Sequence, residues 1–202
     1  LKGLTLQQLD ALFGTERKLG APKSIRTWGD LGLTGEWADK PIHLYAYAND
    51  SGFGVFFSAA AMGGSTRWAC DIHQFDNITD SAGKTITPAG KRILTALAQD
   101  KYGLAYSGIR YTTSDVRPLP IAARPDAPYV APNRENTVNR TYPLVRDIPI
   151  YINRAPGKPI DPKVREFLSY IFSREGQEAV SHEGDYLPLP VELVKQQREM
   201  LK

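Results

Sequence analysis

Apolar residues near the start of the chain recur at the spacing of an α-helix. In residues 6–13 they fall on one face, and the segment begins at a capping-box pair, Thr5 and Gln8. Gly14 follows the last apolar position and is typical of a helix end. The pattern predicts a short helix over residues 6–13.

The next part of the chain alternates between strand and helix patterns. Residues 42–47 predict a strand, residues 49–52 a polar turn, and the apolar run that follows predicts a helix over about residues 53–62. A helix over 88–102 and a strand over 104–107 are expected next. Helices that alternate with strands favour an α/β fold, with a mixed sheet flanked by helices.

The last part of the chain has the clearest helical pattern. Asp161 is a natural N-cap and Pro162 stands at the first helical position, followed by apolar residues at Val164, Phe167, Leu168 and Ile171 that predict a core-facing stripe. A second helix is expected over 173–182, closed by Gly184, and a third from Pro190. An apolar strand over 148–152 is expected before these helices.

Two stretches read as irregular. Five prolines lie between Arg117 and Pro143, which predicts a long excursion or an edge strand, and residues 153–159 predict a turn.

Composition excludes several classes of protein. The chain has 202 residues, 42% of them hydrophobic, and its formal net charge is +3, which is too small and too dispersed for a nucleic-acid-binding face. Its one cysteine, Cys70, has no partner for an intramolecular disulfide, and no apolar stretch approaches the length of a membrane span. The chain begins with Leu1 and shows no targeting peptide, so we interpret this start as an artificial boundary.

The main candidate site is a turn between the predicted strand and the helix that follows it. Ser51, Gly52, Phe53 and Gly54 stand where the first amides of a helix converge with the positive end of its dipole, an arrangement that binds anions. The two glycines allow close approach of the backbone, and the Ser51 hydroxyl offers a further hydrogen bond. The alternative is that polar residues here only cap the helix, and spacing alone favours that reading.

Other candidate sites fail on spacing. Gly83-Lys-Thr85 lacks the first glycine and the leading strand of a phosphate-binding P-loop. The histidines His43, His73 and His182 lack metal-ligand spacing, so we expect no metal and no cofactor. No acid, base and nucleophile set emerges, and we do not expect an enzyme.

Several segments, in order, resemble the second lobe of the phosphate-binding proteins of ABC-type phosphate transporters. They are Leu4–Phe13, Thr27–Leu31, Asp50–Gly52 with Phe56-Phe57, Met62–Gly64, Asp100–Gly108, Tyr142–Arg146 with Ile150–Asn153, Phe167–Gln177 and Gly184–Pro190. The resemblance implies a lobe of the type II periplasmic-binding-protein kind over residues 1–146. It also implies that residues 147–202 hold a crossover strand and carboxy-terminal helices that belong to the first lobe.

The resemblance further implies a bacterial, periplasmic or otherwise extracytoplasmic protein that delivers phosphate or a similar oxyanion to an ABC permease in the membrane. Most of the first lobe is then absent from this sequence, and that lobe or a second copy of the chain is an expected partner. The family pattern at the turn is an arginine, three variable residues, and Ser-Gly-Thr. Ser51 and Gly52 match it, whereas Tyr47 replaces the arginine and Phe53 the threonine.

These two departures keep a second hypothesis open. Arginine makes charge-assisted, often bidentate contacts with phosphate, and a neutral tyrosine does not. The first hypothesis is a phosphate-type solute-binding protein whose ligand residues are Tyr47, Ser51, Gly52 and Phe53. The second is a derived relative that has lost tight phosphate binding and serves as a sensor or protein-interaction module.

Overall fold

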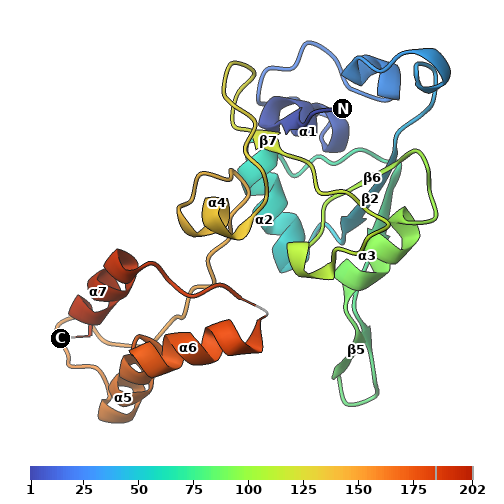
Figure 1. Ribbon diagram of the computed structural model, residues 1–202. Helices are drawn as coiled ribbons and strands as arrows, with labels where there is room; N and C mark the ends of the chain where they lie inside the picture. The colour runs from blue at the N-terminus through green and yellow to red at the C-terminus, as the bar shows by residue number, and fades with distance from the viewer. Residues whose placement is uncertain (185, 202) are drawn as a thin grey trace. The chain divides into compact units, whose positions relative to one another are not determined.

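The computed structural model describes residues 1–184 and 186–201 (Figure 1). Asp185, which belongs to the last family-like motif, lies outside the described residues, as does Lys202. The chain divides into two compact units. Unit 1 comprises Leu1–Pro132 with Tyr142–Leu144, and unit 2 comprises Asn133–Thr141 with Val145–Lys202. The assignment of residues 1–146 and 147–202 to two lobes stays a prediction.

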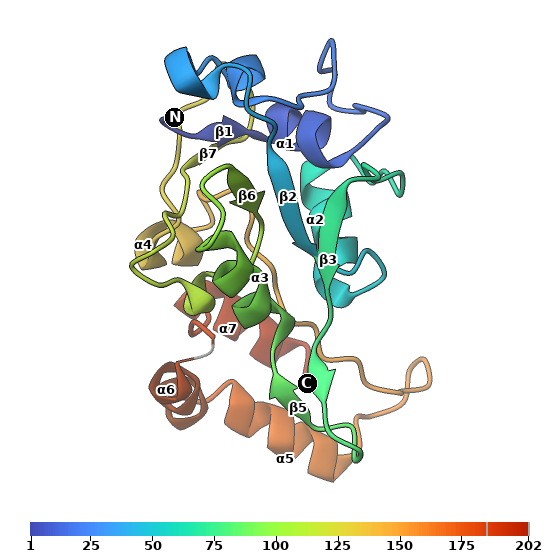
Figure 2. The ribbon, with the colours of Figure 1, turned by 90° about the vertical axis from the view of Figure 1, so that its right-hand side faces the viewer.

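Unit 1 is built on a parallel three-stranded sheet in the order β3-β2-β6 (Figure 2). Its strands are β2 (His43–Tyr47), β3 (Ile72–Phe75) and β6 (Gly103–Ala105). Leu44 and Ala46 of the central strand are buried, at 2% and 0% exposure. Strands connected by helices confirm the predicted α/β fold.

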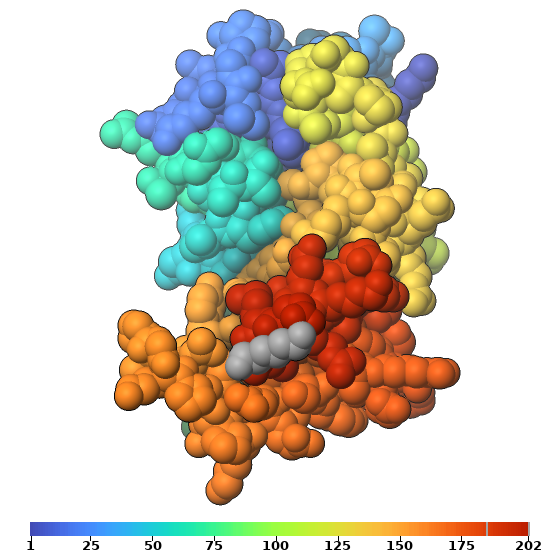
Figure 3. All heavy atoms as spheres, turned by 90° about the vertical axis from the view of Figure 1, so that its left-hand side faces the viewer, coloured from blue at the N-terminus to red at the C-terminus, as the bar shows by residue number. Residues whose placement is uncertain are grey.

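Three α-helices accompany the sheet: α1 (Leu6–Phe13), α2 (Gly52–Ala61) and α3 (Ala89–Leu97). α1 begins at the predicted capping box, in which the Gln8 amide N–H donates to Thr5 Oγ1 at 3.0 Å and the Thr5 amide N–H donates back to the Gln8 side chain. α1 and α2 contact each other, and Figure 3 shows the amino-terminal segment (blue) beside α2 (cyan) on one face.

Shorter elements complete unit 1. They are strands β1 (Leu4–Thr5), β4 (Ile78–Thr79), β5 (Thr85–Thr87) and β7 (Ile121–Ala122), and 3₁₀ helices η1 (Trp28–Leu31), η2 (Gly35–Trp37) and η3 (Ile109–Tyr111). β1 pairs with β7 in parallel, and β4 pairs with β5 as an antiparallel hairpin that extends away from the sheet in Figure 1. Gly83 lies in the tip of this hairpin, at a φ of 79°.

The core of unit 1 contains an aromatic cluster beside its buried aliphatic side chains. Phe57 is 2% exposed; its ring stacks on Tyr106 with centroids 3.9 Å apart and meets Phe13 edge-on at 5.0 Å. Trp28 and Trp37 also meet edge-on, at 5.5 Å. Trp28 therefore packs in the core and Trp37 at its rim.

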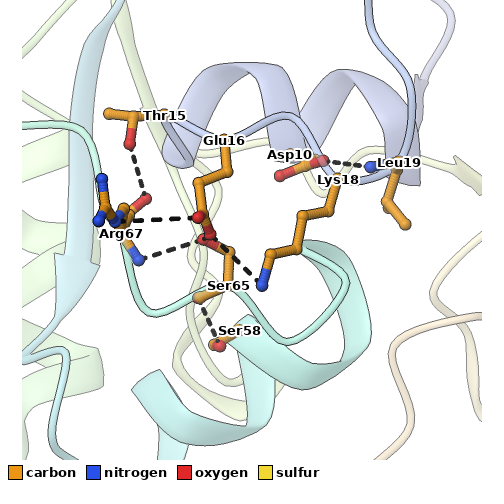
Figure 4. A network of polar contacts seen from close by, with 8 residues as sticks. All are labelled: Asp10, Thr15, Glu16, Lys18, Leu19, Ser58, Ser65 and Arg67. Atoms are coloured by element: carbon orange, nitrogen blue, oxygen red, sulfur yellow. Dashed lines mark hydrogen bonds and ion pairs between the residues drawn. The ribbon is translucent and has the colours of Figure 1, made fainter.

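A polar network joins the loop after α1 to the loop after α2 (Figure 4). The fully buried Ser65 donates its hydroxyl to the Glu16 carboxylate at 2.6 Å and accepts the Arg67 amide N–H at 3.1 Å. The Ser58 hydroxyl donates to the Ser65 carbonyl at 2.8 Å. The Ser65 hydrogen bond, helped by the nearby Lys18, lowers the pKa of Glu16 below its ordinary value. The network fixes the position of two long loops.

Unit 2 contains helices α4 (Arg134–Val138), α5 (Pro162–Ile171), α6 (Arg174–Glu183) and α7 (Val191–Glu199). Asp161 caps α5 as predicted, Ser173 is the N-cap of α6, and Gly184 ends α6 in the left-handed region at a φ of 78°. Pro190 precedes α7, also as predicted. Residues 153–159 contain the predicted turn.

Three predictions require correction. Residues 148–152 form no strand, and Tyr151 is 89% exposed, because a strand needs a partner edge and these residues pair with none of the described strands. The helix predicted over residues 88–102 ends at Leu97, and tight turns rather than further helix lead from there to β6. Only Leu168 of the predicted stripe on α5 is buried, whereas Phe167 is 60% exposed.

Candidate functional site

The turn that follows β2 is held tightly against the start of α2. Ser51 is the N-cap of α2, and its Oγ accepts the Gly54 amide N–H at 3.0 Å. At Gly54 a Cβ atom would lie 2.5 Å from the Asn49 carbonyl oxygen and closer still to that of Ala48. Only glycine permits this approach, so the sequence Asn-Asp-Ser-Gly-Phe-Gly directs the end of the strand into a helix within a few residues.

This turn forms one wall of a cavity of about 450 Å³ within unit 1. The cavity is lined by Tyr47, Ser51, Gly52, Phe53, Phe75, Asp76, Asn77, Thr85, Pro88, Ala89, Gly90, Arg110 and Tyr111. The structure therefore brings the four predicted ligand residues together at one surface. The beginning of α3 lies at the same cavity, and there Asn77 Oδ1 accepts the Ala89 amide N–H at 2.8 Å. Two helix N-termini thus face one space.

The cap and anion-site readings of Ser51 are compatible. A hydroxyl oxygen that accepts one hydrogen bond still carries its own hydrogen, so Ser51 caps α2 and keeps a donor. The first amides of a helix have no carbonyl partner within it, and Gly52 supplies the first amide of α2. The start of α2 therefore presents donors in the geometry that an oxyanion accepts.

At position 47, where the resemblance places an arginine, the structure has a buried tyrosine. Its side chain is 5% exposed, and its ring stacks on that of Phe53 with centroids 4.4 Å apart and planes 13° from parallel. Its hydroxyl oxygen accepts the Gly108 amide N–H at 3.2 Å and lies 3.4 Å from Ser107 Oγ. Burial raises the pKa of Tyr47 despite these hydrogen bonds, so the phenol stays neutral. Tyr47 therefore contributes packing and a loop anchor rather than charge.

Sequence reasoning missed the residues that the loop after β6 brings to the cavity, Arg110 and Tyr111. Tyr45 of β2 is paired in parallel register with Ala105 of β6. Parallel strands end at the same edge, so the segments that follow β2 and β6 meet there. The signal was available, because Arg110 follows the predicted strand over 104–107 by three residues.

A second polar cluster lies at the opposite end of the sheet, where β2 begins. His43 Nδ1 and the Tyr45 hydroxyl contact Asp100 Oδ2 at 2.6 and 2.8 Å, and the Tyr102 amide N–H donates to Asp100 Oδ1 at 2.9 Å. Partial burial acts to raise the pKa of Asp100, but these hydrogen bonds act in the opposite direction and have the larger combined effect. The pKa of Asp100 therefore lies below its ordinary value. Within residues 1–184 and 186–201, no three His, Cys, Asp or Glu residues gather as a metal site.

Comparison with known proteins gives the family. The fold is that of solved phosphate-binding proteins: a protein of Planctomyces limnophilus described as a possible phosphate binding protein superposes with a TM-score of 0.65, over 99% of this chain and 64% of that one, at 17% identity. A family model described as PBP superfamily domain matches residues 1–175. The chain belongs to this PBP superfamily.

Two curated relatives are similar over almost the whole chain. The phosphate-binding protein PstS of Pseudomonas aeruginosa is 37% identical over 196 residues, which cover 96% of this chain and 56% of that protein. Protein SphX of Synechocystis is 28% identical over 196 residues, covering 95% and 52%. The chain spans about half the length of these relatives. PstS is a binding protein by name. In this chain, none of the described helices combines the length and the apolar composition of a membrane span.

Proposed function

We propose that this chain forms the anion-binding half of an extracytoplasmic solute-binding protein, which captures phosphate or a similar oxyanion for an ABC transporter. The observation that carries the proposal is the cavity at the start of α2, where Ser51, Gly52 and Phe53 come together. The names of PstS and of the Planctomyces protein support phosphate as the anion.

The chemistry of capture is electrostatic and needs no reacting group. The amides at the start of α2 and the Ser51 hydroxyl would donate to the anion, and the positive end of the helix dipole would offset its charge. Donors that the fold already holds in place cost little conformational entropy on binding. This role is one of binding and release, and we propose no enzymatic step.

Calorimetric titration of the complete gene product with inorganic phosphate tests this proposal. Ser51→Ala is the informative variant, and Ser173→Ala is its matched control. Both serines cap a ten-residue helix and accept an amide N–H, at 3.0 and 3.1 Å, but Ser173 does not line the cavity. We expect Ser51→Ala to weaken binding several-fold and Ser173→Ala to leave it unchanged. Absence of heat at millimolar phosphate would refute the transport role and favour the sensor or interaction module.

We also propose that a further lobe of the same protein covers the apolar surface of unit 2. Ile148, Ile150 and Tyr151 are 57%, 51% and 89% exposed, and isolated soluble proteins rarely expose such a run. The relatives are almost twice as long as the region they share with this chain.

Hydrogen exchange at residues 148–152 of the complete gene product, together with its molar mass by light scattering, tests this cover. A monomer with protected amides supports a lobe in the same chain. Protection in a dimer identifies a second copy instead, and a monomer without protection overturns the idea of a cover.

Delivery to a membrane permease and the extracytoplasmic location are checked by fractionation of cells and by phosphate uptake in a deletion strain.

A further inference from the structure

The cavity at the start of α2 keeps a cation although the family's arginine is absent. Among the described residues that line it, Arg110 and Asp76 carry charge at neutral pH. Without Arg110 the charged lining would be the Asp76 carboxylate alone, which repels an oxyanion. The sign of the local charge therefore depends on Arg110.

The structure holds the backbone beside Arg110 in a defined place. The Gly108 amide N–H donates to the Tyr47 hydroxyl oxygen at 3.2 Å, and Ser107 Oγ donates to the Gly90 carbonyl at 3.1 Å. Gly108 is the N-cap of η3, so these two bonds tie η3 to the end of β2 and the start of α3. At Gly90 a Cβ atom would collide with both the Tyr111 ring and the Tyr47 hydroxyl. The absence of a side chain there lets η3 approach α3 closely.

The guanidinium of Arg110 is itself oriented by its neighbour. Arg110 Nη2 donates to the Tyr111 hydroxyl at 2.7 Å, and the guanidinium carbon lies 4.7 Å from the centroid of that ring. Tyr111 also lines the cavity. A guanidinium is a planar fork of five donors and matches an oxyanion in two places at once.

We propose that Arg110 is the cation that binds the anion in this site, and that Tyr47, which occupies the family's arginine position, is a positioning residue that anchors the Arg110 loop. The inference rests on the proposed function and names a ligand residue for that same site. In this proposal the positive charge at the site comes from the loop after β6 rather than from the end of β2. The two strands pair in parallel, so both segments leave the sheet at the same edge.

The test measures phosphate affinity of the complete gene product by calorimetry for Arg110→Gln and Arg110→Lys. The matched control is Arg117→Gln, which removes the same charge from an exposed arginine that likewise makes a hydrogen bond, to the Leu1 carbonyl, outside the cavity. We expect Arg110→Gln to weaken binding about 10- to 100-fold, the range for loss of a charge-assisted contact. Arg110→Lys should lose less, and Arg117→Gln should stay within about twofold.

The role of Tyr47 is tested by Tyr47→Phe, which keeps the stacked ring and removes the anchoring hydroxyl. We expect affinity to fall several-fold in the wild-type background and not to fall further when Arg110→Gln is already present, because the anchor acts through the arginine. Circular dichroism and thermal unfolding of each variant show whether the fold is retained. An equal, additive loss in both backgrounds would overturn the positioning role.

The outcomes of these titrations distinguish failure of this inference from failure of the proposed function. If the wild-type protein shows no affinity for millimolar phosphate, the proposed function fails and the inference with it. If the wild type binds and Arg110→Gln binds as well as Arg117→Gln, the inference fails and the binding function stands. A selective loss in Arg110→Gln, with a weaker dependence of affinity on salt, supports the inference.

Discussion

Substitution of Gly54 by alanine is the most direct test of how the fold builds the turn at the start of α2. In the first turn of an open helix this change would stabilise the protein by roughly 0.5–1 kcal/mol, because alanine loses less backbone entropy than glycine. The structure predicts the opposite sign. The added Cβ atom would meet the carbonyl groups of Ala48 and Asn49, which belong to the backbone and cannot rotate away.

The size of the effect follows from the contact distances. The Asn49 carbonyl oxygen would lie 2.5 Å from the new Cβ atom, so the start of α2 has to retreat from the turn by about 1 Å to restore ordinary contact. Overpacking of this kind costs about 1–3 kcal/mol. After the gain in helix propensity, we expect a net destabilisation of about 1–2 kcal/mol, which lowers Tm by roughly 2–8 °C in a chain of this size.

Thermal and urea unfolding followed by circular dichroism measures this loss. Val55→Ala is the control, because Val55 is the next residue of α2 and is 60% exposed, so its truncation should change stability by less than about 0.5 kcal/mol. We also expect Gly54→Ala to weaken phosphate binding, because the first amides of α2 move with the helix. A Tm equal to or above that of the wild type would refute the steric reasoning and leave propensity as the deciding effect.

Three further changes test other parts of unit 1. Phe57→Ala should cost about 3–5 kcal/mol in urea unfolding, because the ring is 2% exposed and its removal leaves a cavity; a loss below about 1 kcal/mol would contradict this packing. Ser65→Ala should cost about 1–3 kcal/mol, because it removes the buried hydroxyl that donates to Glu16, and Glu16→Gln in the same background should then add little. Hydrogen bonds from Lys23 and from nearby backbone amides hold the pKa of Asp30 well below its ordinary value, so its stabilising contribution is present above about pH 4 and is lost as the pH falls toward the folded-state pKa. Asp30→Asn should therefore flatten the fall in stability between about pH 4 and pH 2. An unchanged profile of stability against pH would exclude this carboxylate as a source of the acid-induced loss of stability.

Local signals in the sequence predicted most of the secondary structure. The capping box at Thr5 and Gln8, the N-caps at Asp161 and Ser173, and the terminating Gly184 each satisfy backbone groups within a few residues. Such interactions depend on neighbours in sequence, so a pattern reveals them. The segment over 148–152 failed as a strand for the converse reason, because strand formation depends on a distant partner.

The same distinction between local and distant interactions applies to the candidate site. Ser51, Gly52 and Gly54 form a turn whose chemistry is local, and its spacing alone favoured helix capping, with an anion site as the other hypothesis. The pattern showed that Arg110 follows a predicted strand, but not that this strand pairs in parallel with β2. That pairing places the ends of the two strands at one edge and brings Arg110 to the cavity, although the residues lie far apart in the chain.

The sequence by itself therefore determined the family, the alternation of helices and strands, and the turn at which an oxyanion is proposed to bind. Through the resemblance, it also predicted that Tyr47 stands where the family pattern has an arginine. Only the tertiary structure decided what surrounds Tyr47. Burial of Tyr47, its hydrogen bond with the Gly108 amide and the approach of η3 to α3 are contacts between distant segments, and they place Arg110 at the cavity. Charge is carried by a side chain, but its position is set by the packing of the strands and loops around it.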